Sequence, residues 1–462
     1  MKRIFSVLSV LVLLIGLFAG CGKTAEEPAE EVETTQPLPT LEGTVTISGE
    51  AKEDTLLTAQ TSVTAPLYQW FVDGVPMDNA NTENFQVPVN AAGKEITVSV
   101  SAEGYGNAIL SEGVTAVANP SDYKSMAGMY HASKILGRVF LDQTDPTAAH
   151  IEWPASGFEF NIHAEGDSLK IHYDTAYEST LAVFIDGVMQ ERPILIRKSG
   201  GFYCTFPITP GDHTVRVVRE FEPQTHEGSY QLLKGVEFKG TVEERPADKD
   251  VYIEIIGDST ATGSGAMGVH RPGQGFLTTD YSNTSSFGYQ VAKDFDADYS
   301  IVAKGNCGFL SGDIIQNKSM TDVYEYWWRW HTEDKYTFLR CPDVIIMKIG
   351  MNDSAGAGFS VEQFKEAAEK FILRLREIYG EEPIILWFDS VTSSTYRDSQ
   401  FTAMQELQQK MGDEKFYVAQ FQHGFDGAGP ATSNSGLPSA QNQRDLADQI
   451  TAFLKDTAGF GK

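Results

Sequence analysis

The sequence is short of positive charge and of cysteine. It has 36 Lys and Arg residues against 63 Asp and Glu residues, which gives a net charge of -27. Because a nucleic-acid-binding protein needs a basic face for the phosphates, this balance argues against nucleic acid as a partner. Only four cysteines are present, and their spacing matches no metal site. We therefore expect neither nucleic-acid binding nor a cysteine-held metal ion.

The first 21 residues differ from the rest of the chain. Lys2 and Arg3 precede an almost wholly apolar run, and Ala19, Gly20 and Cys21 close it. The run is short for a membrane span, so a cleaved signal peptide over residues 1–20 is favoured over a transmembrane helix. The ending resembles a bacterial lipobox, which implies lipidation of Cys21. Its acyl chains would anchor the protein at the extracellular face of the bacterial membrane.

Three further cysteines lie in the body of the chain, at positions 204, 307 and 341. An odd number cannot pair completely within one chain. We interpret Cys204, Cys307 and Cys341 as mostly buried thiols, with a bridge between the last two as the alternative.

Composition divides the remaining chain into a linker and three domains, as expected for 462 residues. Residues 21–40 are acidic, are rich in Pro and Thr, and predict a disordered spacer. Residues 41–118 and 120–245 have the alternating pattern of β-strands, whereas residues 248–458 alternate strands with helices.

Residues 41–118 predict a β-sandwich. The segment Tyr68-Gln-Trp-Phe-Val72 is strand-like, Trp70 is a candidate core anchor, and Asp73-Gly74 predicts a hairpin turn. The region resembles the Ig-like repeats of bacterial surface proteins, which implies a spacer or adhesion module rather than a catalytic domain.

Residues 120–245 predict a second all-β domain. Alternation is clear over residues 158–162, 181–185 and 213–218, and no helix is convincing. Seven or more strands of this kind predict a β-sandwich or jelly roll.

Residues 248–458 predict a doubly wound α/β domain with a parallel sheet. Short apolar runs fit buried strands, and amphipathic segments fit helices over residues 360–379 and 441–454. The expected strands cover residues 251–256, 299–303, 344–349, 383–387 and 415–419.

Three motifs follow the first three of these strands. They are centred on Ser259, Gly305 and Asn352. Ligands of open α/β sheets bind at the carboxyl ends of the strands, so these residues are expected to meet. A serine in a tight turn exposes its hydroxyl, and N–H groups and an asparagine amide can donate to an oxyanion. The neighbouring Asp258 is expected to order the turn.

This set resembles the SGNH hydrolase superfamily, whose fold is flavodoxin-like. The resemblance implies that Ser259 is the nucleophile. The N–H groups of Ser259 and Gly305 and the side chain of Asn352 would form the oxyanion hole. No metal or organic cofactor is implied.

The jelly-roll region makes the resemblance more specific. The chain over roughly residues 124–458 is similar to carbohydrate esterase family 2, which implies a serine esterase that removes acetyl groups from polysaccharide. The jelly-roll segments that carry the resemblance are Gly137-Arg-Val139, Ile151-Glu-Trp-Pro154, Phe184-Ile-Asp-Gly187, Gly211-Asp-His-Thr-Val215 and Arg219-Glu-Phe-Glu222.

The sequence departs from that family at the catalytic base. The family has a His-Pro-Ser run before the last helix, and here Leu437 stands in place of the histidine. Leucine cannot accept the serine proton. His423, in the loop that should carry the base, is the candidate substitute, with Asp389 or Asp426 to orient its ring.

Two functional alternatives therefore stay open beside the esterase. A catalytically impaired, glycan-binding lipoprotein would keep the site without turnover, whereas a lipid esterase lacks the expected apolar lid segment. Both the carbohydrate esterase and the glycan-binding lipoprotein would bind sugars. The candidates for stacking on them are Trp327, Trp328 and Trp330. Helical spacing of this aromatic stretch predicts that part of it packs in the core instead.

Overall fold

The computed structural model describes residues 38–142, 145–195, 202–222, 230–312, 318–328, 331–355, 359–390, 395–429 and 436–461. The predicted signal peptide, Cys21 and most of the acidic linker lie outside these residues. Within the described part of the chain, no helix has both the length and the apolar character needed to cross a membrane. Contacts divide the chain into two units, Met1–Ser121 and Asp122–Lys462.

The described part of the first unit consists of two antiparallel sheets around one core. Trp70 is fully buried there and stacks on Phe85 at 5.1 Å, which confirms it as a core anchor. Asp73 and Gly74 form a two-residue turn with positive φ at both positions, which confirms the predicted hairpin. One sheet contains β1 Val45–Ser48, β2 Leu56–Thr61 and β5 Asn84–Gln86, and the other contains β3 Leu67–Val72, β4 Val75–Pro76, β6 Glu95–Ser101, β7 Ile109–Leu110 and β8 Val114–Thr115.

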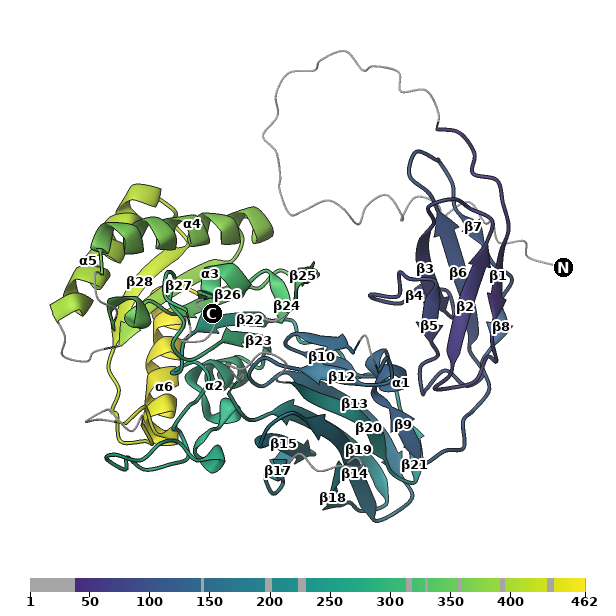
Figure 1. The fold of residues 1–462 in the computed structure, drawn as a ribbon, viewed down its shortest axis with the longest axis horizontal. Helices are drawn as coiled ribbons and strands as arrows, with labels where there is room; N and C mark the ends of the chain where they lie inside the picture. The colour runs from purple at the N-terminus through teal and green to yellow at the C-terminus, as the bar shows by residue number, and fades with distance from the viewer. Residues whose placement is uncertain are drawn as a thin grey trace. The chain divides into compact units, whose positions relative to one another are not determined.

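The second unit begins with two larger antiparallel sheets in a jelly-roll-like arrangement (Figure 1). The first sheet contains β10 Lys134–Leu136, β13 Gly157–Ala164, β15 Ser179–Ile185, β16 Val188–Met189, β17 Ile194–Leu195, β19 Gly211–Arg219 and β21 Gly240–Val242. The second contains β9 Tyr123–Ser125, β11 Val139–Leu141, β12 Ala149–Ile151, β14 Ser168–Thr175, β18 Phe202–Pro207 and β20 Gln231–Glu237. The expectation of no helix is wrong for α1 (Met126–Tyr130), because five residues are too short to show helical periodicity.

The rest of the second unit is an α/β domain. Its described residues form a parallel sheet in the order β23-β22-β26-β27-β28, as in flavodoxin-like folds. The strands are β22 Tyr252–Gly257, β23 Asp298–Ala303, β26 Val344–Lys348, β27 Ile384–Ser390 and β28 Phe416–Phe421. The helices are α2 Phe287–Asp294, α3 Met320–Val323, α4 Val361–Tyr379, α5 Thr395–Met411 and α6 Ala440–Asp456.

Helices cover both faces of this sheet (Figure 1). Apolar side chains of α2 and α6 pack with Ile255 and Ile301 on one face. Those of α4 and α5 pack with Ile256 and Val302 on the other. Both faces are apolar because the strands are buried on both sides, as doubly wound sheets require.

A buried ion pair joins the jelly roll to the α/β domain. Arg138, just before β11, lies 3.2 Å from Glu254 in β22, and both side chains are fully buried. The guanidinium group also lies over the rings of Tyr324 and Tyr336, at 4.8 and 4.3 Å. The two domains therefore meet through a polar contact inside one core, which fixes how the jelly roll faces the sheet.

Two sequence expectations about local structure are corrected. The aromatic stretch after α3 is not helical: β24 (Tyr326–Trp328) pairs with β25 (His331–Lys335) as a hairpin. Cys204, Cys307 and Cys341 form no disulfide with one another, so the alternative bridge is not formed. Cys307 is buried as expected, but Cys204 is only partly buried and Cys341 is exposed.

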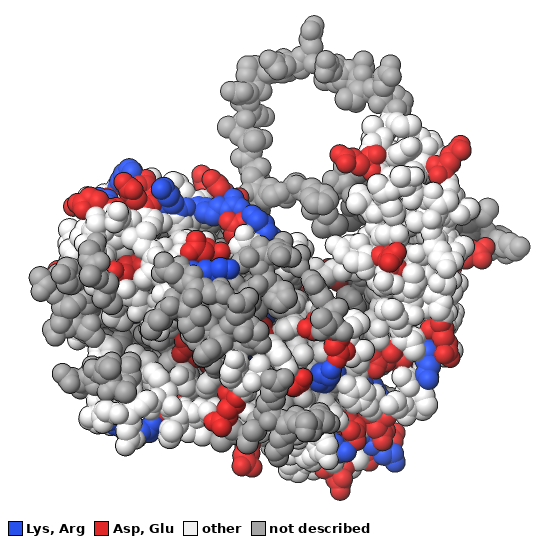
Figure 2. Space-filling view, in the orientation of Figure 1, with Lys and Arg blue, Asp and Glu red and all other residues white. Residues whose placement is uncertain are grey.

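Charges of both signs lie on the described surface that Figure 2 shows. On the face seen in Figure 2, the described Lys and Arg side chains lie scattered among Asp and Glu side chains and form no continuous basic face. This distribution agrees with the acidic composition of the whole chain.

Candidate active site

Ser259 lies in a tight turn directly after β22. Thr262 Oγ1 and the Ser264 N–H both donate hydrogen bonds to the Ser259 carbonyl oxygen, at 2.8 and 3.2 Å. Ser259 is partly exposed, and within the described chain neither its hydroxyl nor its N–H is hydrogen-bonded. Both groups are therefore open to a bound ester. We refer to residues 258–268 as the nucleophile loop.

Asp258 orders this turn, as the sequence predicts. Its side chain is fully buried, and Oδ1 accepts the Thr260 N–H at 2.9 Å. Lys348, the last residue of β26, brings its ammonium group to 3.7 Å from Oδ2 with the side chain 2% exposed. A buried pair of this kind holds the end of one central strand against the start of the nucleophile loop.

Asn352 follows the neighbouring strand β26, in the 3-10 helix η5 (Met351–Ala355). Its Nδ2 donates to the Cys307 carbonyl at 2.9 Å. Because this nitrogen carries two hydrogens, one remains for a ligand. The adjacent Asp353 is buried and accepts the N–H groups of residues 309–311 at 2.6 to 2.9 Å, which fixes the loop after β23.

The N–H of Gly305 is already engaged. It donates to Glu222 Oε1 at 2.8 Å, and Lys304 Nζ donates to the same oxygen at 2.7 Å. Glu222 comes from the jelly roll, three residues after β19 ends. The role of Gly305 as an oxyanion-hole donor stays a prediction, and it requires the hydrogen bond to Glu222 to be given up.

Glu222 is a site residue that the sequence reasoning missed. Burial alone would raise the pKa of its carboxyl group, but the charge of Lys304 and hydrogen bonds from Lys304, Ser264 and Gly305 lower the pKa below its ordinary value. The group is thus an anion at neutral pH. The sequence showed Glu222 only as part of the jelly-roll pattern, because no local motif links it to Gly305, 83 residues further on.

Leu437 lies against the nucleophile loop. The Gly427 N–H donates to the Leu437 carbonyl, and the Leu437 N–H donates to the Ala428 carbonyl, both at 2.9 Å. The Ala428 N–H in turn donates to the Gly265 carbonyl at 2.9 Å. A Cβ atom added to Gly265 would lie 3.2 Å from the Leu437 Cβ. Leu437 also stands two residues before Ser439, the N-cap of α6. An apolar side chain therefore occupies the position at which carbohydrate esterase family 2, the family that the sequence resembles, has its histidine.

His423 follows β28, as predicted. Its Nδ1 lies 2.9 Å from the Gly424 carbonyl oxygen, which can only accept, so Nδ1 is the donor and in the neutral ring Nε2 has the lone pair that a base needs. The ring also lies 4.4 Å from the ring of Phe425. The orienting roles of Asp389 and Asp426 stay predictions.

His270 is a second histidine near the nucleophile loop. Its backbone N–H donates to the Asp426 carbonyl at 3.2 Å, which ties it to the loop that carries His423. Both ring nitrogens are enclosed, and within the described residues neither has a hydrogen-bond partner. Unsatisfied buried polar atoms are uncommon in native proteins and need a reason. We therefore treat His270 as a candidate base beside His423.

The predicted sugar-stacking tryptophans are only partly described. Trp327 packs its ring on Tyr336 at 4.7 Å and on Phe140 at 6.2 Å, and its carbonyl accepts the indole N–H of Trp153 at 2.8 Å. These contacts place it where the jelly roll meets the α/β domain. The side chain of Trp328 and the whole of Trp330 lie outside the described part, so the stacking platform stays a prediction.

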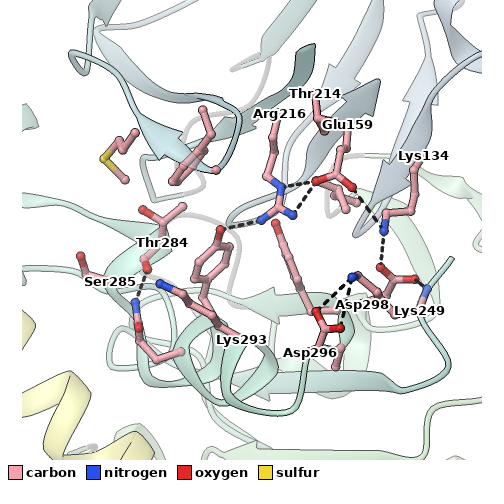
Figure 3. Close-up of a pocket in the computed structure, with 18 residues that line it drawn as sticks. Lys134, Glu159, Thr214, Arg216, Lys249, Thr284, Ser285, Lys293, Asp296 and Asp298 are labelled. Atoms are coloured by element: carbon pink, nitrogen blue, oxygen red, sulfur yellow. Dashed lines mark hydrogen bonds and ion pairs between the residues drawn. The ribbon is translucent and has the colours of Figure 1, made fainter. Parts of the chain in front are cut away.

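A separate pocket of about 450 Å³ lies between the jelly roll and α2, at the amino end of β23 (Figure 3). Most of its charged side chains bind one another: Arg216 and Lys134 both contact Glu159, and Lys134 also contacts Asp298 at 2.8 Å. This pocket is therefore a polar interface away from Ser259. Among the described residues, no group of three or more His, Cys, Asp or Glu side chains is placed to hold a metal ion.

The fold of the second unit, a jelly roll followed by a parallel α/β domain, is also the fold of solved carbohydrate esterases of family 2. A family two carbohydrate esterase from Clostridium thermocellum, in complex with cellohexaose, matches with a TM-score of 0.61 and 20% identity, over 71% of this chain and 99% of that one. An acetyl xylan esterase from Butyrivibrio proteoclasticus matches with a TM-score of 0.61 and 19% identity, over 74% and 99%.

Sequence comparison identifies the jelly roll directly. Residues 135–243 match the family described as carbohydrate esterase 2 N-terminal, so the chain contains this domain. The acetylxylan esterase / glucomannan deacetylase of Cellvibrio japonicus is 28% identical over 240 residues, which are 50% of this chain and 63% of that enzyme. The match thus spans less than two thirds of that relative. The predicted resemblance to carbohydrate esterase family 2 is confirmed, whereas the Ig-like resemblance of residues 41–118 stays a prediction.

Proposed function

We propose that this protein is a carbohydrate O-deacetylase, held at the extracellular face of the bacterial membrane by a lipid on Cys21. The observation that carries the proposal is the hydroxyl and N–H of Ser259, which make no hydrogen bond within the described chain and follow β22, while Asn352 follows the neighbouring parallel strand β26. The matching jelly-roll domain and a relative named as an acetylxylan esterase and glucomannan deacetylase support acetylated polysaccharide as the substrate. The first unit would act as a spacer or adhesion module of Ig-like type.

The site suggests an acyl-transfer mechanism. Ser259 Oγ attacks the acetyl carbonyl carbon while its proton passes to a histidine. The Ser259 N–H and the remaining hydrogen of Asn352 Nδ2 donate to the carbonyl oxygen as it gains negative charge. The bond to the sugar oxygen breaks, that oxygen takes the proton, and water then releases acetate from Ser259.

Glycan binding without turnover is the alternative, and two observations favour it. Leu437 fills the expected base position, and Glu222 holds the Gly305 N–H. Without a base, oxyanion stabilisation alone leaves on the order of 10³-fold catalysis over water. Such a protein would still hold polysaccharide in the site.

The first test is hydrolysis of 4-nitrophenyl acetate by the protein without its first 21 residues. We expect turnover that Ser259→Ala abolishes. His423→Ala and His270→Ala are compared in parallel, and a loss of about 100-fold in one of them alone identifies the base. Wild-type activity no higher than that of Ser259→Ala would reject the esterase, and binding of acetylated polysaccharide by both proteins would then establish the alternative.

A further inference from the structure

The carboxylate of Glu222 connects two loops of the candidate site. Oε1 accepts from the Gly305 N–H at 2.8 Å and from Lys304 at 2.7 Å, and Oε2 accepts from Ser264 Oγ at 2.6 Å. Ser264 belongs to the nucleophile loop, whereas Lys304 and Gly305 follow β23. We propose that Glu222 is a positioning residue that sets the spacing of these loops from the jelly-roll side. This inference rests on the proposed esterase function.

A series of polar contacts connects the Glu222 carboxylate with the backbone of Ser259. Ser264 Oγ also lies 2.6 Å from Thr262 Oγ1, which donates to the Ser259 carbonyl at 2.8 Å. The Ser264 N–H donates to the same carbonyl at 3.2 Å. A displacement of the Glu222 carboxylate therefore changes the support of the backbone that presents the nucleophile.

Glu222 is itself held firmly. Arg219, 1% exposed, donates from Nη2 to the Glu222 carbonyl at 3.0 Å and from Nε to the Phe221 carbonyl at 2.8 Å. On the other side, a Cβ atom added to Gly305 would lie 2.3 Å from Glu222 Oε1. The carboxylate thus fills a fixed gap between the two domains, so the reach of the Glu222 side chain sets the spacing of the two loops.

The Glu222 contacts also explain why this residue does not act on the substrate. Both oxygens bind protein donors, and the charge is matched by Lys304, whose side chain is 4% exposed. The donors left for an oxyanion are the Ser259 N–H and Asn352. Their placement depends on loops that Glu222 joins, and a shift of about 1 Å in such groups costs on the order of 100-fold in rate.

Three substitutions of Glu222 separate the effect of its side-chain length from the effect of its charge. In Glu222→Gln, Oε1 can still accept from Gly305 and Lys304, while Nε2 donates to Ser264 Oγ, whose hydroxyl then turns to Thr262. Glu222→Asp keeps the charge but is one methylene shorter, and Glu222→Ala removes all three contacts. Glu159→Ala is the matched control, because Glu159 also binds cations between the jelly roll and the α/β domain, away from Ser259.

We expect kcat for 4-nitrophenyl acetate to fall about tenfold or more in the Asp and Ala variants, with KM within about threefold. The control should stay within about threefold of wild type, and the Gln variant should keep more of its kcat than the Asp variant. If Glu222→Ala does not fold, Glu222→Asp decides. The inference is wrong if kcat per folded protein is unchanged or rises in the Asp variant, or if Glu222→Asp retains activity that Glu222→Gln loses.

Hydrogen exchange of the peptide that contains residues 304–308 gives a readout that needs no catalysis. Exchange should be faster in the Asp and Ala variants than in the Gln variant, and unchanged in the control. If wild type shows no Ser259-dependent turnover, the esterase proposal fails, but faster exchange still supports the Glu222 link. Equal exchange in all variants overturns the link even in an active enzyme.

Discussion

A leucine side chain packed against the nucleophile loop has no atom that accepts a proton. The backbone hydrogen bonds of Leu437 do not depend on its side chain, so a histidine can replace it without loss of those bonds. In a protein that also carries His423→Ala and His270→Ala, we expect Leu437→His to raise Ser259-dependent hydrolysis of 4-nitrophenyl acetate about 100-fold, the contribution of a positioned general base. Activity should grow with pH as the imidazole loses its proton near pH 6.5.

Leu437→Gln provides the control, because glutamine is polar but cannot act as a base at neutral pH. A gain in the Gln variant equal to that in the His variant would mean that polarity alone matters. No gain in the His variant would show that position 437 cannot reach the Ser259 hydroxyl.

The surroundings of His150 in β12 predict that the stability of the jelly roll depends on pH. Its ring nitrogens each lie 2.7 Å from a carboxylate, Glu152 on one side and Asp142 on the other. Burial alone would lower the pKa of His150, but these two partners outweigh it and raise the pKa above 6.5. A raised pKa in the folded state means that the stabilisation is complete below pH 6.5 and is lost as pH rises above it.

We therefore expect the thermal unfolding midpoint to fall between pH 6 and pH 9 in the wild-type protein. The His150→Gln variant should be less stable at pH 6 and should lose less stability over the same range. A His150→Gln protein with the same pH profile as wild type would contradict this assignment.

The sequence predicted those residues of the candidate site that directly follow a strand. Ser259 and Asn352 follow apolar strands, and the sheet rule brings such positions together. Glu222 was not predictable in this way, because its partners lie in another domain and pair with it only after both domains fold. The enclosed ring of His270 depends on loop packing, which leaves no periodic pattern in the sequence.

At the scale of elements, the stability of α6 depends on the cap at its N-terminus, beside Leu437. Ser439 Oγ accepts the Asn442 N–H at 3.4 Å, and Asn442 Oδ1 accepts the Ser439 N–H at 3.2 Å, which is a reciprocal capping box. We expect Ser439→Ala to lower the free energy of unfolding by about 1 kcal/mol, measured by urea denaturation. Ser439→Asp, which keeps an acceptor, should lose less.

Ser360 offers a comparison within the same domain. It caps α4 through a single bond to the Gln363 N–H at 3.3 Å, without the reciprocal contact. Ser360→Ala should therefore cost less than Ser439→Ala. The reverse order would show that the reciprocal bond at α6 adds nothing.

Most α/β elements follow from the sequence because their patterns are strong. The apolar run at residues 344–349 became β26 Val344–Lys348, and the helix predicted over residues 360–379 is α4 with Ser360 as its cap. The hairpin β24–β25 was not predictable, because its aromatic residues also fit helical spacing. There the contact of Trp327 with Phe140 and Tyr336 overrides local preference.

At the scale of the whole molecule, the jelly roll and the α/β domain are expected to unfold together. Arg138 crosses from one to the other, and Glu254 accepts hydrogen bonds from it and from Tyr379. Arg138→Met would leave the Glu254 carboxylate buried without a cation. We expect this substitution to lower the free energy of unfolding by about 3–5 kcal/mol.

The double variant Arg138→Met, Glu254→Gln should recover part of that loss, because no charge is then left buried. Urea denaturation followed by tryptophan fluorescence measures both proteins. If the single variant loses less than about 1 kcal/mol, the pair is not a determinant of the domain interface.

The gap between Gly305 and Glu222 has an evolutionary consequence. Since a Cβ atom at position 305 would lie 2.3 Å from the Glu222 carboxylate, position 305 can gain a side chain only if Glu222 also changes. Relatives that carry a larger residue at the equivalent of 305 should have lost the glutamate at the equivalent of 222, and those that keep the glutamate should keep the glycine. The two domains, although separate in sequence, are thereby expected to be inherited as one matched pair.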